Sequence, residues 1–459
     1  VDDNATFADP TDDREVERVN ADIAMGNALA AVRWERDAHR WALLGMVVHQ
    51  ARGLPGPATV VSPDSRQIRT RILTSLGYRF RGDTPGRTDA FATVAVGFDE
   101  ERVRDPFGRI GLGREDSEDR YLSIDARGGA FVELWPWLSL GTTTFFRHDD
   151  IRPRDRFATP GDQPATRDLL VVAAESHLSA LYSRFELTLR GSASAQSTWV
   201  RRDATGRMGA ESALRQTVPN FRLEAAANFA SSLSLSALLT SGVQLPTILQ
   251  LFGNRDTIVA NPDLQPERSL SVDTGLRYAP RWGPVLFNAS LRFFWLDVED
   301  IIVARRTAIN TVVFRNEREG NTWGTEIGLD VTVDGWLRSS TSLTVLKTRF
   351  DNAGFESALP LRVPLRWFQR WSVPLVGRAL DASLEIDHRS AFFTDVANQV
   401  EQPSLTVVNV GFEAISKSDG LRLGLYVRNL FDVLGQDLLA FPLPGRAFHI
   451  SLQWRASPR

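Results

Sequence analysis

The chain has 459 residues, 43% of them hydrophobic, with 53 basic and 56 acidic side chains and no cysteine. The ordinary apolar fraction excludes an intrinsically disordered chain, and the absence of cysteine excludes disulfide scaffolds, zinc–cysteine sites and thiol nucleophiles. A net charge of -3 gives no long-range field for nucleic acid, so no nucleic-acid partner is expected.

Apolar and polar residues alternate along the chain with a period of two, which predicts β-strands. Even the longest uncharged stretch, residues 225–254, alternates in this way and is therefore not predicted to be a transmembrane helix. In chain order the alternating segments are 20–34, 41–50, 67–80, 88–100, 119–134, 138–147, 167–180, 185–199, 216–229, 233–243, 268–278, 285–297, 316–333, 337–349, 361–375, 380–389, 404–415, 421–430 and 446–455.

Three features favour an all-β, transmembrane antiparallel barrel over a soluble sandwich. The alternating segments are about 9 to 12 residues long, which suits tilted membrane-crossing strands. Tight turns alternate with the polar loops 101–118, 147–165, 200–215 and 389–404, as in outer-membrane barrels. Seven tryptophans collect beside the short turns, the pattern of an interfacial aromatic girdle: Trp34, Trp41, Trp135, Trp137, Trp282, Trp336 and Trp454.

The predicted strand number is about 19, an odd number. Bacterial single-chain barrels have even strand numbers, with both termini on the periplasmic side. We therefore expect a single barrel domain over residues 1–459 that is incomplete at its N-terminal side. Residues 1–19 are expected to be an extracellular loop or linker.

Two motifs resemble those of a known family. Residues 427–432 (Val-Arg-Asn-Leu-Phe-Asp), followed by residues 441–448, resemble the closing signature of TonB-dependent outer-membrane receptors. Residues 245–253 and then 261–267 (Asn-Pro-Asp-Leu-Gln-Pro-Glu) resemble the mid-barrel signature of the same family. The prolines cannot donate hydrogen bonds to a central ladder, and Asn429 and Asp432 suit the capping of a strand end. A structural role is therefore predicted for both motifs.

The resemblance implies the architecture and the partners of the protein. Receptors of this family have a 22-strand barrel with an N-terminal plug domain inside it, so the chain is expected to lack the plug and about three strands. These parts are expected to be a separate chain, a cleaved segment or a segment outside this sequence. The implied location is the outer membrane of a Gram-negative bacterium. The implied partners are outer-membrane lipid, a small-molecule ligand, and TonB through the absent N-terminal segment.

No enzymatic chemistry is predicted. The sequence contains no HExxH, GxSxG, GxxxxGK[ST] or GxGxxG motif. His148, Asp149 and Asp150 form the one mixed cluster of possible metal ligands, and they are expected to belong to a solvated strand end rather than to a metal site. The prediction is therefore a protein that is not an enzyme and has no cofactor and no metal.

The function that the resemblance implies is TonB-dependent import of a scarce ligand, such as a ferric siderophore or another nutrient. Arginines and aromatic residues of the predicted outer loops and upper lumen are candidate ligand-binding residues, because arginine suits anionic ligands. The candidates are Arg255, Asp256, Arg305, Arg306, Phe392 and Phe393. Two alternatives remain open: a structural or scaffold subunit of an outer-membrane assembly, and a passive pore without a plug.

Overall fold

The computed structural model describes most of the chain. The described residues are 19–56, 61–82, 87–110, 114–157, 164–182, 185–202, 213–229, 232–253, 258–308, 311–317, 319–352, 355–377, 379–416, 420–438 and 441–454. Within these residues, no helix is long and apolar enough to cross a membrane.

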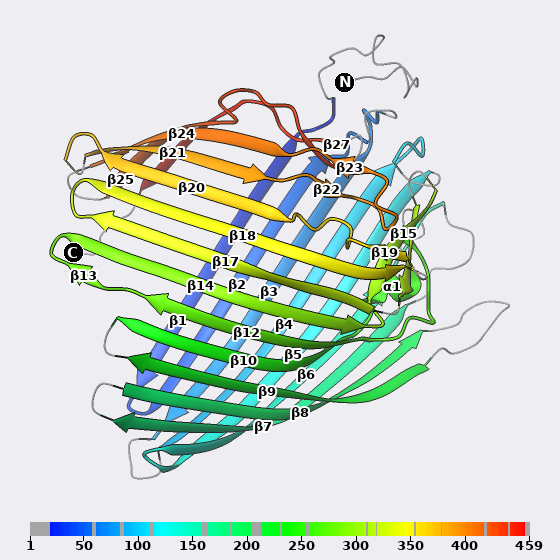
Figure 1. The fold of residues 1–459 in the computed structure, drawn as a ribbon. Helices are drawn as coiled ribbons and strands as arrows, with labels where there is room; N and C mark the ends of the chain where they lie inside the picture. The colour runs from blue at the N-terminus through cyan, green and yellow to red at the C-terminus, as the bar shows by residue number, and fades with distance from the viewer. Residues whose placement is uncertain are drawn as a thin grey trace.

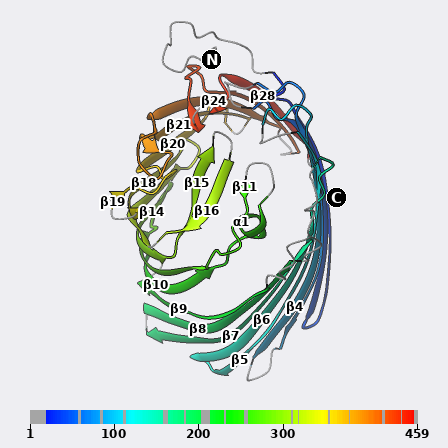
Figure 2. The same cartoon turned by 90° about the vertical axis from the view of Figure 1, so that its right-hand side faces the viewer.

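One antiparallel sheet of 21 strands makes up the wall of the molecule and curls into a barrel (Figures 1 and 2). Two of the 21, β13 (Arg281–Trp282) and β19 (Phe355–Ser357), are short additions to hairpins, which leaves nineteen long strands. The first ten long strands are β1 (Ile23–Arg36), β2 (His39–Gly53), β3 (Arg66–Arg81), β4 (Thr88–Asp105), β5 (Glu115–Trp135), β6 (Leu138–Arg152), β7 (Ala165–Tyr182), β8 (Phe185–Arg202), β9 (Ala213–Phe229) and β10 (Leu233–Gln244). The other nine are β12 (Glu267–Tyr278), β14 (Val285–Glu299), β17 (Glu319–Val333), β18 (Leu337–Asn352), β20 (Leu365–Pro374), β21 (Leu380–Arg389), β24 (Leu405–Ile415), β25 (Leu421–Arg428) and β28 (Ala447–Trp454).

Each long strand corresponds to one segment predicted from the alternation, so the all-β fold and the predicted strand number are confirmed. Several predicted loops are too long, however. Residues 101–105 belong to β4 and residues 115–118 to β5, so the loop predicted over 101–118 is only 106–114. The loop predicted over 147–165 also shortens, because β6 continues to Arg152.

The two faces of the wall differ as the alternation predicts. Outward-facing side chains of β3 and β4 include Ile72, Leu76, Val94 and Val96, each more than 40% exposed. The alternate residues of these strands face the barrel interior and are frequently charged. An apolar outer face and a polar inner face are what a bilayer and a wet lumen require.

The tryptophans near the short turns lie at one end of the barrel. Trp34 of β1 is opposite Trp41 of β2, and the rings of Trp135 and Trp137 stack with centroids 5.4 Å apart. Trp336 follows the turn at Gly335, whose φ of +75° favours glycine, and is 77% exposed. This arrangement confirms that the tryptophans collect on the short-turn side.

The remaining elements fold into the mouth of the barrel or line its rim. Figure 2 shows α1 (Ile248–Phe252) together with a small sheet of β11 (Ile258–Val259), β16 (Thr311–Asn316) and β15 (Ile302–Ala308) inside the ring of long strands. Two further hairpins complete the set of elements: β22 (Phe392–Phe393) with β23 (Glu401–Gln402), and β26 (Gln436–Leu438) with β27 (Phe441–Pro442). The periodicity did not predict α1 or the β15–β16 hairpin.

The two ends of the sheet are unlike the rest of the wall. Every consecutive pair of long strands is hydrogen-bonded, but no ladder joins β1 to β28 among the described residues. All fourteen residues of β1 are exposed, and so are Phe448, Ile450 and Trp454 of β28. Because nineteen strands alternate in direction, β1 and β28 run the same way through the membrane.

Candidate functional site

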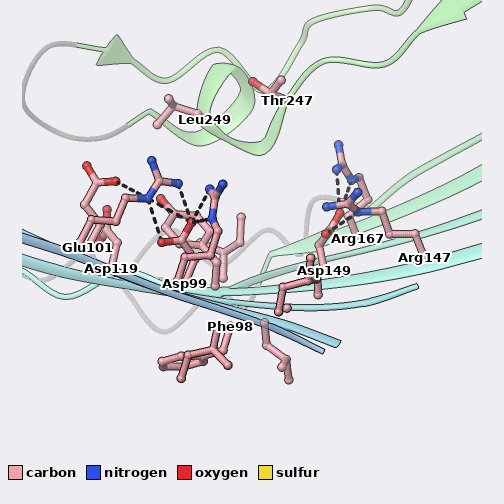
Figure 3. A pocket seen from close by; sticks show the side chains of 18 of the residues that line it. Phe98, Asp99, Glu101, Asp119, Arg147, Asp149, Arg167, Thr247 and Leu249 are labelled. Carbon is pink, nitrogen blue, oxygen red and sulfur yellow. Dashed lines mark hydrogen bonds and ion pairs between the residues drawn. The ribbon is translucent and has the colours of Figure 1, made fainter. Parts of the chain in front are cut away.

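A cavity of about 720 Å³ lies inside the barrel between α1 and the inner face of β3 to β7. Thr247 and Leu249 border it from the side of the helix, and charged side chains border it from the side of the wall (Figure 3). Four arginines and six carboxylates line this cavity: Arg69, Arg71, Arg147 and Arg167, with Asp99, Glu101, Glu115, Asp119, Asp125 and Asp149. We call this set the lumenal network.

Strand alternation and register bring the lumenal network together. Arg69 and Arg71 are two residues apart on β3, so both side chains point to the same face. The ladder places Arg71 directly opposite Asp99 and Arg69 opposite Glu101 on β4. Farther along the wall, Asp149 of β6 is opposite Arg167 of β7.

Asp99 is shared by two arginines. The Nε atom of Arg69 donates to Asp99 Oδ1 at 2.9 Å, and Nη2 of Arg71 donates to Asp99 Oδ2 at 2.7 Å. Glu101 lies 3.7 Å from Arg69 as a second anionic neighbour. The side chain of Asp99 is only 14% exposed, whereas that of Arg71 is 50% exposed, so arginine N–H groups remain accessible from the cavity.

Asp149 of β6, two strands along the wall, is also shared by two arginines. Its Oδ1 accepts from Nε of Arg147 at 2.8 Å, and its Oδ2 accepts from Nη2 of Arg167 at 2.7 Å. Asp149 is buried, and Asp125 lies 3.7 Å from Arg147. The wall therefore presents two Arg–Asp–Arg units, each combining two guanidinium groups with one carboxylate that is largely shielded from solvent.

Local capping and loop contacts position α1 over the cavity. The side chain of Thr247 accepts a hydrogen bond from the backbone N–H of Gln250, and the side chain of Gln250 accepts one from the backbone N–H of Thr247. This reciprocal capping box stabilises a helix that is only five residues long. Leu251 and Leu264 pack in a small buried cluster with Val200, which ties the helix to the wall.

The mid-barrel motif joins α1 to the β15–β16 hairpin. Asn261 Nδ2 donates to the carbonyl of Phe314 at 2.7 Å. Asn316 Nδ2 donates to the carbonyl of Gln265 at 2.8 Å, and Asn316 Oδ1 accepts from the backbone N–H of Gln265 at 2.8 Å. The motif fastens two loops together inside the barrel mouth, which agrees with the predicted structural role.

The closing motif is also structural. Asn429 is buried with a φ of +51°, and its Oδ1 accepts from the backbone N–H of Val433 at 2.9 Å. The Oδ1 of Asp432 accepts from the backbone N–H of Arg446 at 2.6 Å. These side chains cap the chain as it leaves β25 and returns to β28, as predicted.

The predicted ligand-binding residues do not form one cluster in the described structure. Arg255 and Asp256 lie outside the described residues. Arg305 of β15 forms an ion pair with Glu317, and its neighbour Arg306 follows it on the same strand. Phe392 of β22 is buried, with the guanidinium of Arg389 5.0 Å from the centre of its ring, and Phe393 is adjacent. Their role in ligand binding stays a prediction.

The lumenal network was not predicted from the sequence. Of its residues only Asp149 was named there, as part of a solvated strand end, whereas the structure buries it. The sequence does carry a signal for this network. Charged residues stand at alternate positions of neighbouring strands, as Arg69 with Arg71 and Asp99 with Glu101 do. Among the described residues, no three possible ligands form a metal site. His148, part of the predicted cluster, instead hydrogen-bonds Asp168, 2.7 Å away. The network offers hydrogen-bond donors and acceptors to a polar molecule in the lumen.

Comparison with known proteins identifies the class of this barrel. The family model described as TonB dependent receptor-like, beta-barrel matches residues 12–430, so the chain belongs to this family. It is an outer-membrane protein of a family of transporters, not of enzymes. Comparison with curated protein sequences finds no match.

Solved structures of similar fold include transporters and receptors. The "Copper transporter OprC" is 17% identical with a TM-score of 0.77, over 95% of this chain and 73% of that chain. The FrpB iron transporter from Neisseria meningitidis is 16% identical with a TM-score of 0.74, over 94% and 72%. The ferric yersiniabactin uptake receptor FyuA from Yersinia pestis is 13% identical with a TM-score of 0.66, over 94% and 68%.

Proposed function

We propose that the chain forms most of the barrel of a transporter that imports a scarce ligand, such as a ferric siderophore or another nutrient, using energy delivered by TonB. Family membership supports coupling to TonB. The observation that carries the proposal is the cavity between α1 and the lumenal network. It is a polar compartment at the barrel mouth, and loops folded into the lumen cover it.

The chemistry of the cavity favours a polar ligand with several oxygen atoms. The half-exposed guanidinium of Arg71 keeps N–H groups free for the carboxylate, hydroxamate or catecholate oxygens of such a ligand. The balance of four arginines and six carboxylates also favours a ligand that carries a cation. A metal complex meets both requirements.

We further propose that an odd number of strands closes the barrel between β1 and β28. Both edges are unpaired in the described structure and run in the same direction, so closure by antiparallel pairing alone requires one further strand, or three, between them. Three strands give the expected 22, and a plug domain would precede them. A second copy of the chain cannot supply them in the same membrane orientation, because its own edges run the same way.

The closure proposal has a direct test. Mass spectrometry of the protein purified from outer membranes should find a polypeptide that continues upstream of Val1, or a companion chain that carries the plug and the first strands. A preparation that contains only residues 1–459, and still conducts no ions in planar bilayers, would contradict the proposal. A barrel with unpaired edge strands and no plug should let ions pass through the bilayer.

Transport is tested in a bacterial strain that lacks its own receptors and expresses the full-length gene. The probes are a ⁵⁵Fe-labelled ferric catecholate, a ⁵⁵Fe-labelled ferric hydroxamate, haem and Cu²⁺. We expect uptake of at least one probe to require TonB. Arg69→Gln combined with Arg71→Gln should reduce this uptake at least tenfold, whereas Arg366→Gln combined with Arg370→Gln on the opposite wall should leave it nearly unchanged.

The same assay separates the two alternatives. Uptake that persists without TonB, together with ion conductance in planar bilayers, would identify a passive pore. If no probe is taken up and the barrel does not conduct ions, a structural or scaffold role is favoured instead. Either outcome overturns active import.

A further inference from the structure

The outer face of the barrel carries a group of arginines on β4, β5, the end of β6 and the segment that follows it. The ladder places Arg104 opposite Asp116, Arg102 opposite Glu118, and Arg120 opposite Arg152. After β6 the chain continues along β5, with reciprocal backbone hydrogen bonds between Glu118 and Arg154 and one from Arg156 to Asp116. We call the following set the outer arginine patch: Arg102, Arg104, Arg120, Arg152, Arg154 and Arg156.

The patch lies on the side of the wall opposite the lumenal network. On β4, Asp99 and Glu101 point into the lumen, so Arg102 and Arg104 at the alternate positions point outward. Figure 3 shows Phe98 on the opposite side of the strands from Asp99 and Glu101, which gives the direction of the outer face. The side chains of Arg152 and Arg156 are 71% and 77% exposed.

The outer arginine patch has a net positive charge. Six arginines are accompanied on this face by four carboxylates: Glu100, Asp116, Glu118 and Asp150. The carboxylates form ion pairs with some of the arginines, as between Arg102 and Asp116 at 3.0 Å and Arg120 and Glu118 at 2.6 Å. These pairs align the guanidinium groups and leave an excess of two positive charges.

The patch is continuous with the surface that faces lipid. Directly toward the short-turn side, the next outward residues are Phe98 on β4 and Leu122 on β5, followed by Val96 and Ile124. Each pair of residues adds about 6.6 Å along a strand, so the three outward positions from Glu100 to Arg104 lie about 7 to 20 Å along β4 beyond Phe98. In an outer-membrane barrel, that level is the head-group layer of the outer leaflet.

We propose that the outer arginine patch binds the phosphate groups of a glycolipid in the outer leaflet, whose acyl chains lie against the apolar residues below. Arginine binds phosphate through paired N–H donors, and basic groups beside a membrane span bind anionic head groups. A single ligand with phosphates above and acyl chains below matches the order of the two surfaces along the strand, which is charged at Arg102 and apolar at Val96. An acidic protein partner would match only the charged part. The proposal does not rest on the transport activity.

The test compares lipid binding by the barrel purified from outer membranes with that of a variant carrying Arg104→Gln, Arg152→Gln and Arg154→Gln. Native mass spectrometry measures the affinity for diphosphorylated lipid A and for the same lipid without phosphates. We expect wild type to prefer the phosphorylated lipid. The triple variant should bind it about a hundredfold more weakly, because each basic residue near the surface contributes roughly a fivefold factor.

Two controls make the test specific. Lys347→Gln with Arg349→Gln removes two outward cations from β18 on another part of the barrel and should change lipid A binding less than threefold. Replacing the same three patch arginines with lysine should retain part of the affinity. Heat-modifiable mobility on gels verifies folding, and the single variant Arg104→Gln, expected to weaken binding several-fold, replaces the triple variant if the latter does not fold.

Equal affinity of wild type and variant for diphosphorylated lipid A would overturn the proposal. So would equal affinity of wild type for the two lipids. Loss of binding to an acidic protein, with lipid A binding retained, would assign the patch to a protein partner instead.

Discussion

The wall formed by β4 to β8 differs from the wall formed by β20 to β28 mainly in strand length. β4, β5 and β7 have 18, 21 and 18 residues, whereas β20, β25 and β28 have 10, 8 and 8. Crossing a bilayer takes about 9 to 11 residues of tilted strand. The strands of the short wall therefore extend little beyond the membrane, whereas the strands of the long wall extend well beyond it.

The additional residues of the long wall are charged on both faces. Inside, they form the lumenal network around Asp99 and Asp149, and outside they form the outer arginine patch. The parts of the strands that extend beyond the bilayer thus carry the charged surfaces with which this barrel can bind other molecules. The two walls should therefore respond differently to substitution.

The largest effect is expected from a charge introduced at the lipid-facing band of either wall. Val94→Arg on the long wall and Leu423→Arg on the short wall should each destabilise the barrel by about 2 to 4 kcal/mol, because the arginine is placed in hydrocarbon. Thr70→Arg on the neighbouring strand β3, also outward but beyond the band, should cost at most about 1 kcal/mol. Chemical unfolding in lipid vesicles measures all three, and a cost at Thr70 equal to that at Val94 would contradict the proposed membrane boundary.

A smaller effect is expected from breaking ion pairs in the lumen. Asp149→Asn removes the buried partner of Arg147 and Arg167 and should cost about 1.5 to 3 kcal/mol, the usual contribution of hydrogen bonds to charged groups. The matched variant Asp387→Asn on the short wall breaks a more exposed pair with Arg366 and should cost less than about 1 kcal/mol. Equal costs in denaturant unfolding would show that the two networks do not differ.

A local effect is expected where the long wall is covered by loops. Asn316→Ala removes the hydrogen bonds to Gln265 and to the carbonyl of Asp300, so amide exchange around Gln265 and α1 should accelerate at least tenfold. Asn228→Ala, which removes one exposed hydrogen bond to Glu186 on the barrel wall, is the control and should leave exchange at α1 unchanged. Unchanged exchange in Asn316→Ala would mean that the motif does not hold the two loops together.

The smallest effect concerns the link between β1 and the start of β3. Arg66 donates a hydrogen bond to Asp22, 3.1 Å away, and this contact lowers the pKa of the Asp22 carboxyl below its usual value. The contact should therefore stabilise this edge at pH values above about 4, the usual pKa of an unfolded aspartate, and be lost as the pH falls below the folded pKa. Local amide exchange at residues 20–24 in wild type and Asp22→Asn should differ at pH 7, and the difference should shrink as the pH falls below about 4. A difference that stays constant with pH would contradict the assignment.

The strand predictions succeeded where the environment of the two faces differs. Between lipid and lumen, residues such as Leu380 and Asp381 alternate in polarity, so a period of two appears directly in the sequence. Beyond the membrane both faces are wet, as at Arg102 and Glu101, and the alternation disappears. Residues 101–105 and 115–118 were predicted as loop for this reason, although they are paired strand.

The site was only partly predictable. The mid-barrel and closing motifs indicated the family and its structural capping roles, and Asn429 and Asp432 perform those roles. The lumenal network was not predicted, because its pairs join strands about 20 to 30 residues apart, as Arg71 and Asp99 do. The positions of α1 and the β15–β16 hairpin depend on contacts between two loops, as at Asn316 and Gln265, which carry no periodic signal.

The sequence by itself determined the number of long strands, which face of each meets lipid, and the family to which the barrel belongs. These properties follow from alternation and from short motifs, both of which are local along the chain. Only the tertiary structure decided which charges share a partner, which loops fold into the lumen and which strands remain unpaired at the two edges. Those properties depend on register between strands and on the closure of the barrel, where residues distant in sequence become neighbours.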